Sequence, residues 1–271
     1  MEGSTRVGTR ERARAILSSE GVAAKPVRGV GSFLAMALDT FALMFKPPFA
    51  WREFLLVTWF VARVSILPTL LLSIPFVVLA TFIINILIME FGAADFSGSA
   101  TALASVTQIG PIVTVLVVAG AGATAMCADL GARTIREELD AMRVLGINPI
   151  QALVVPRVLA ATLVALMLES LVSGAGLAGG FFFSVFIQHV TPGAFAAGLP
   201  LLVGLPELII ALIKASLFGL AAGLIACFKG ISVGGGPAGV GIAVNETVVY
   251  SFVALFLINL LATAVGVKAT M

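Results

Sequence analysis

Five apolar stretches, each long enough to cross a membrane, dominate this 271-residue sequence. A transmembrane helix needs about 20 apolar residues to span roughly 30 Å of hydrocarbon. Hydrophobic residues make up 60% of the chain and charged residues only 11%, which excludes an ordinary soluble domain. We therefore expect an all-α integral membrane protein with spans at about 64–89, 100–126, 150–187, 201–227 and 242–267.

The part before the first span divides into two segments. Residues 1–30 are polar and basic, and they contain no apolar region of a signal peptide, so we expect a mobile cytoplasmic tail. Residues 33–63 are expected to form helices at the membrane interface. Phe33–Phe45 is too short to span, and Trp51 and Trp59 can act as interfacial anchors. The rest of the chain, 31–271, reads as one membrane domain.

The distribution of lysine and arginine predicts the orientation. Nine of the sixteen precede the first span, four lie in 128–157, and none lies in 92–99 or 189–200. Positive charge accumulates on the cytoplasmic side of membrane proteins. The N-terminus is therefore expected in the cytoplasm and the C-terminus outside.

The most charged part of the chain lies between two spans. Seven of the 30 acidic and basic residues fall between Asp129 and Arg143. Thr134 and Glu137 have the spacing of a capping box, and Gly146 stands where a C-terminal cap belongs. We therefore expect a short cytoplasmic helix over 134–146. Its polar face would carry Arg136, Glu137, Glu138, Asp140 and Arg143.

The opposite face of this expected helix is a narrow apolar stripe of Ile135, Leu139, Met142 and Leu145. One reading is a solvated helix that rests on the bilayer. Membrane-surface helices, however, usually carry a face rich in lysine and arginine, and 129–143 has four acids and three bases. The mixed charge favours a groove on a partner protein.

Three segments resemble the MlaE/YrbE permease family. The stretch "ADLGARTIREELDAMRVLGINPIQALVVPR", Ala128–Arg157, closely resembles the family signature. "QIGPIVTVLVVAGAGATA", Gln108–Ala125, is similar to the helix before it, and "AVNETVVYS", Ala243–Ser251, to the start of the last helix. The details look like the actinobacterial YrbE branch, whose members work with Mce proteins.

The resemblance implies a membrane subunit of an ABC-type lipid transporter in the bacterial cytoplasmic (inner) membrane. Such a subunit pairs with a second permease, here in an expected heterodimer, and docks a cytoplasmic ATPase that holds ATP and Mg²⁺. Mce proteins outside carry lipid, and the path would serve import of fatty acids, sterols or related lipids. The segment Thr134–Gly146 would then be the coupling helix in the ATPase groove. Gln108 and Pro111 are implied as residues of the lipid cavity.

Two ionisable residues, Glu169 and Lys214, lie deep in predicted spans. Unpaired charge near the centre of a bilayer is costly, so the two side chains are expected to pair. A static ion pair between helices is one reading. A gate or a contact for a lipid headgroup or carboxylate is the other.

Other functional classes find less support in the sequence. There is no HExxH, and His189 is the sole histidine, so neither a catalytic set nor a metal site is expected. The "GGGPAGVG" of Gly234–Gly241 follows a span rather than a strand, which favours a turn over a nucleotide site. No P-loop motif is present, so ATP is expected on another polypeptide. An intramembrane enzyme and a secondary transporter remain the alternatives, and no nucleic-acid partner is expected.

Overall fold

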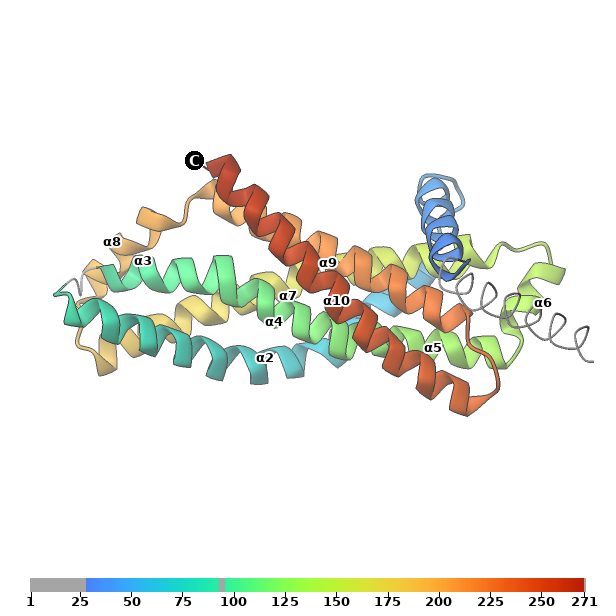
Figure 1. Cartoon of the computed structure of the whole chain (residues 1–271), viewed down its shortest axis with the longest axis horizontal. Coiled ribbons are helices and arrows are strands. Elements are labelled where there is room, and N and C mark those ends of the chain that lie inside the picture. Colours follow the sequence, from blue (N-terminus) through green and yellow to red (C-terminus); the bar gives the residue numbers. More distant parts are fainter. Residues whose placement is uncertain (1–27, 93–95, 271) are drawn as a thin grey trace, which may run out of the picture.

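The computed structural model describes residues 28–92 and 96–270. The described residues form helices and connecting turns, and five helices are long and apolar enough to cross a membrane. Figure 1 shows these helices running along the long axis of one elongated bundle. The expected all-α integral membrane fold is confirmed.

The first part of the structure corrects the expected interfacial region 33–63. A helix over 28–44 lies across the long axis of the bundle, and α2 (Trp51–Glu90) then runs without interruption through the whole first span. Trp51–Arg63 is thus the beginning of a transmembrane helix and not a separate elbow. Charge did not break this helix, because Glu53 finds basic partners inside the protein, as described below.

The second span is longer than the expected 100–126, because it continues through the first charged residues to Ile135. It alternates α-helical and π-helical segments. A π-helical turn inserts an extra residue and rotates the side chains that follow, and such turns are frequent at functional sites. In chain order the segments are α3 (Ser97–Ala102), the π-helix Leu103–Ile109, α4 (Gly110–Val117), the π-helix Val118–Ala123 and α5 (Thr124–Ile135).

The short helix α6 (Glu138–Val144) follows, and the third span then covers Ile150–Ile187, in agreement with the expected bounds. Most of this span is α7 (Val155–Phe182). The π-helices Ile150–Val154 and Phe183–Ile187 flank it.

The last two spans begin at residues other than those expected. Leu201 and Leu202 belong to a separate short helix, α8 (Pro192–Leu202), so the fourth span, α9 (Leu205–Ile231), starts after Gly204. Only the first part of Gly234–Gly241 forms the expected turn, with positive φ at Gly235 and Gly236, because α10 (Pro237–Thr270) begins within this segment.

Close helix packing holds the bundle together. α7 packs against both α2 and α9. Gly219 and Gly223 of α9 bring the backbones close, because a Cβ at Gly219 would lie 2.5 Å from the carbonyl oxygen of Ala161. Helix 28–44 and α6 lie at one end of the bundle, and the C-terminal end of α10 lies at the other (Figure 1).

Candidate functional site

The start of α6 differs from the expected capping box. Thr134 lies within α5, where its hydroxyl donates to the carbonyl oxygens of Leu130 at 2.9 Å and Gly230 at 3.0 Å. It therefore has no role as a cap. The break between α5 and α6 comes from Glu137, which adopts the left-handed conformation at φ 59°, and α6 begins at Glu138. The expected helix 134–146 is thus two helices joined by a tight turn.

The end of α6 agrees with the expectation at Gly146. This residue has φ +75° and donates its amide to the Arg143 carbonyl at 3.1 Å, while the amide of Ile147 reaches Met142 at 2.9 Å. These two bonds form a Schellman motif, which favours glycine because its backbone accepts positive φ. Gly146 therefore fixes where α6 stops.

The apolar face of α6 is divided between anchoring and exposure. Leu139 is 3% exposed and belongs to a buried cluster with Met36 of helix 28–44 and Leu153 of the third span. Val144 and Leu145, by contrast, are 87% and 74% exposed. One end of α6 is thus anchored on the protein, and the other presents apolar surface.

The five charged residues expected on this helix all lie around the turn and α6. Arg136 donates to Glu138 at 2.8 Å, and Arg143 donates to Asp140 at 2.7 Å. Glu137 is exposed. Pairing within the segment pre-organises these side chains at the surface. Exposed pairs of this kind contribute little to stability, so their positions do not follow from a need to stabilise the fold.

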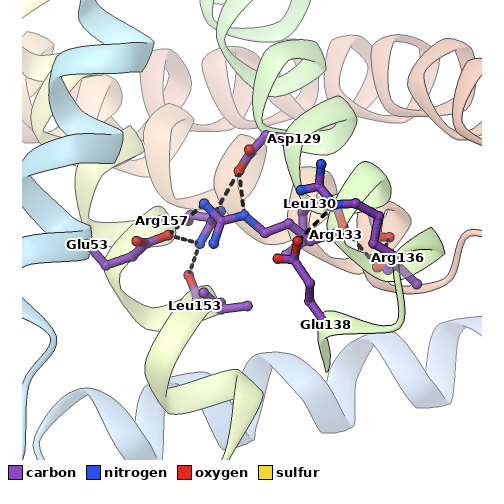
Figure 2. A network of polar contacts seen from close by, with 10 residues as sticks. Glu53, Asp129, Leu130, Arg133, Arg136, Glu138, Leu153 and Arg157 are labelled. Carbon is purple, nitrogen blue, oxygen red and sulfur yellow. Dashed lines mark hydrogen bonds and ion pairs between the residues drawn. The ribbon is translucent and has the colours of Figure 1, made fainter. Parts of the chain in front are cut away.

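A second cluster of charges lies deeper at the same end of the bundle (Figure 2). We call Glu53, Asp129, Arg133 and Arg157 the charge clamp. Arg157 is fully buried, with Nη1 2.9 Å from Glu53 and Nη2 2.7 Å from Asp129. Arg133 lies 3.5 Å from both acids. Because Glu53 is on α2, Asp129 and Arg133 are on α5 and Arg157 is on α7, the charge clamp joins three helices.

The sequence did not predict that the four residues of the charge clamp lie together. Asp129, Arg133 and Arg157 all fall inside the Ala128–Arg157 signature, which was a usable signal. Glu53 precedes them by more than seventy residues, and no local pattern connects it to them. Only the packing of α2 against α7 brings it into place.

The expected direct ion pair between Glu169 and Lys214 is not formed, although the two charges lie close enough to interact electrostatically. Within the described residues, Glu169 instead accepts hydrogen bonds from Thr114 at 2.9 Å and Ser173 at 3.3 Å. Lys214 donates to Thr263 at 2.9 Å. Each charged group thus hydrogen-bonds to hydroxyl groups on neighbouring turns or helices.

Lys214 lines a cleft of about 210 Å³ between the spans. Gln108 lines the same cleft, whereas Pro111 is buried and is not among its lining residues. The cleft mixes polar groups with aliphatic ones. Its lining consists of Leu103, Thr107, Gln108, Leu202, Glu207, Ile210, Ala211, Lys214, Thr263 and Gly266.

These features define a multi-pass membrane protein with a cleft of aliphatic and polar residues between its spans and an anchored, partly exposed helix at one end. Comparison with known proteins gives its family. The family described as "Permease MlaE" matches residues 54–265. The chain belongs to the MlaE permease family.

Curated relatives are similar to this chain at low to moderate identity. A probable ABC transporter permease protein of Synechocystis is 32% identical over 169 residues, which cover 62% of this chain and 64% of that protein. The chloroplastic protein TRIGALACTOSYLDIACYLGLYCEROL 1 of Arabidopsis thaliana is 33% identical, over 59% of this chain and 46% of that protein. The intermembrane phospholipid transport system permease protein MlaE of Haemophilus influenzae is 27% identical, over 66% and 69% respectively.

Proposed function

We propose that this chain is the permease subunit of an ABC-type lipid transporter and that α6 docks its ATPase. The observation that carries this proposal is α6 itself, a short helix anchored by Leu139 whose end exposes Val144 and Leu145. Exposed apolar residues beside charged ones are the pattern that a groove on a partner protein accepts. Membership of the MlaE permease family and the names of the relatives support the same function.

The exposed apolar residues and the exposed charged residues at α6 have different roles in docking. Leu145 and Val144 supply the apolar contact that contributes most of the affinity, because buried apolar anchors dominate interfaces. Glu137, Asp140 and Arg143 select the partner and the register, since charges at a rim act mainly on specificity. ATP and Mg²⁺ belong to the ATPase and not to this chain.

Co-purification of the ATPase tests the docking role of α6. Leu145→Asp places a charge in the apolar contact and should lower the amount of ATPase recovered with the permease by about tenfold or more. Leu145→Met keeps an apolar side chain of similar size and should leave recovery unchanged. Equal recovery with all three proteins would show that the ATPase docks elsewhere. Combined charge reversal at Glu137 and Glu138 should weaken recovery less than Leu145→Asp does.

The cleft beside Lys214 is the part of the lipid path that this chain contributes. Its aliphatic residues suit acyl chains or sterols, and the Lys214 ammonium suits an acidic group on the lipid, either a carboxylate or a phosphate. Glu207 also lines the cleft, but its carboxylate accepts from the Gly204 amide at 2.8 Å and so has a partner. Lys214 hydrogen-bonds to the Thr263 hydroxyl and makes no direct ion pair within the described residues, which leaves its ammonium able to bind an anion.

Mass spectrometry of the lipids that co-purify with the complex tests this assignment. Lys214→Met should lower the ratio of acidic to neutral lipid by about tenfold, the loss expected for one charge-assisted hydrogen bond. Lys229→Met removes a lysine that pairs with Glu246 outside the cleft and serves as the control. An unchanged ratio in Lys214→Met would contradict a role in lipid selection. The masses also distinguish a fatty acid from a phospholipid.

The proposed assembly follows the family branch that the sequence resembles. A second permease of the YrbE type would pack beside this chain as a heterodimer, and α10, the least buried of the five spans, has the most surface to offer. Mce proteins would deliver lipid outside for import. The chain would sit in a bacterial inner membrane with its N-terminus and α6 in the cytoplasm and its C-terminus outside, as the positions of lysine and arginine predict.

A further inference from the structure

The charge clamp is tied mechanically to α6. Only Arg136 and Glu137 separate α5 from α6. The turn is held by hydrogen bonds from the Arg136 amide to Ala132 at 3.2 Å and from the Glu137 amide to Thr134 at 3.1 Å. Because this turn is tight, a displacement of α6 moves the end of α5, which carries two members of the charge clamp.

The other two members belong to different spans. Glu53 lies in the first turn of α2, and Arg157 lies near the start of α7, where Nη1 also donates to the Leu153 carbonyl at 3.1 Å. The α5 side chains thus reach α2 through Glu53 and α7 through Arg157. Figure 2 shows the four side chains converging between these helices.

The geometry of the charge clamp permits movement without loss of charge compensation. Each of the two carboxylates contacts both guanidinium groups, at 2.7 to 2.9 Å from Arg157 and at 3.5 Å from Arg133. A shift of α5 can therefore bring one acid closer to Arg133 while the other still pairs with the buried Arg157. Coupling between distant sites requires an element with two discrete arrangements, and this network offers alternative partners for one.

A purely stabilising role explains the charge clamp less well. Buried ion pairs can often be replaced by apolar residues of similar volume with no loss of stability, since the cost of removing the charges from water offsets their attraction. Stable packing of the three helices therefore does not require these four charges. They are suited to a connection that must change partners.

We propose that the charge clamp transmits the displacement of α6 to α2 and α7, so that Glu53, Asp129, Arg133 and Arg157 are positioning residues that couple ATP hydrolysis to lipid movement. The inference rests on the proposed function, because α6 is displaced only if an ATPase binds there. Glu53 is the sole member of the charge clamp on α2. Its loss therefore removes the ionic link from α2 to Arg133 and Arg157, while the contact between Asp129 and Arg157 still connects α7 to α5.

The test uses the whole transporter, with its partner permease and ATPase, reconstituted in lipid vesicles. Glu53→Gln should leave ATPase recovery and ATP hydrolysis within about twofold of wild type, and should lower the lipid moved per ATP by about tenfold or more. Lys229→Gln is the matched control, because it breaks an ion pair between α9 and α10 that includes no α5 residue. It should keep the wild-type ratio.

Spin labels on two helices separate transmission from general damage. Leu56 of α2 and Leu163 of α7 are both exposed positions that can carry a label. In the wild type, both labels should report a change on addition of ATP. In Glu53→Gln, the α2 label should lose its response and the α7 label should keep it. A merely structural role would alter both labels, or the folding of the protein, without this selectivity.

The outcomes distinguish the two proposals. An unchanged ratio of lipid to ATP in Glu53→Gln, or a retained response of the α2 label, would overturn the role of the charge clamp and leave the proposed function intact. A wild-type complex that moves no lipid on hydrolysing ATP would overturn the proposed function, and the clamp inference with it. Arg157→Gln leaves two acids without their closest partner and can fail to fold, so the test relies on Glu53→Gln.

Discussion

At the scale of single residues, the two deep ionisable groups Glu169 and Lys214 each hydrogen-bond to hydroxyl groups and not directly to each other. The sequence identified Glu169 and Lys214 as deep ionisable groups, but it predicted a pair that the structure does not contain. Glu169 points toward Thr114 of α4, and Lys214 toward Thr263 of α10. The π-helix Leu103–Ile109 precedes α4 and rotates it, and no sequence pattern reveals this rotation.

The position of Glu169 depends on a glycine in α4. A Cβ at Gly110 would lie 2.5 Å from Glu169 Oε1 and 2.8 Å from the Ser105 carbonyl, so Gly110→Ala cannot be accommodated without movement of the carboxylate. We expect this substitution to lower the free energy of unfolding by about 1–3 kcal/mol, as overpacking does. Thermal unfolding of the detergent-solubilised protein measures it. Gly120→Ala, with nothing within 4 Å of the added Cβ, should have no such effect.

At the scale of helices, the sequence predicted the number of spans more reliably than their first and last residues. Apolar length located all five spans, and positive φ at Gly146 ends α6 as the sequence indicated. The start of α6 was not predictable, because Thr134 and Glu137 match a capping box by spacing alone. In the structure, the Thr134 hydroxyl binds the Gly230 carbonyl of α9, a tertiary contact that overrides the local preference.

The contact between α7 and α9 gives a prediction at this scale. The spacing of Gly219 and Gly223 indicated a close approach of helices, and the structure supplies the partner, α7 of the same chain. Gly219→Ala should destabilise the bundle by about 1–3 kcal/mol, because its Cβ would meet the α7 backbone. Gly174→Ala meets nothing within 4 Å and is the control in the same unfolding measurement. Equal stability of the two variants would show that α7 and α9 are not packed in this way.

At the scale of the molecule, the fold connects an exposed helix at one end to a cleft within the spans. The sequence alone gave the fold class, the family resemblance and α6 as the candidate contact. It could not give the charge clamp, because Glu53 meets Arg157 only after α2 and α7 pack. The sequence also predicted an interfacial segment before the first span, whereas α2 already begins at Trp51. Charged residues suggest such a segment as long as their partners in the fold are unknown.

The central claim is that ATP hydrolysis by an ATPase docked at α6 drives lipid through this chain. The most direct measurement is ATP-dependent movement of a fluorescent lipid across vesicles that contain the reconstituted transporter, compared between wild type and Leu145→Asp. The account predicts movement that requires ATP in the wild type and falls by about tenfold or more in the variant, because its ATPase no longer docks. Movement that proceeds equally without ATP, or equally in Leu145→Asp, would contradict it.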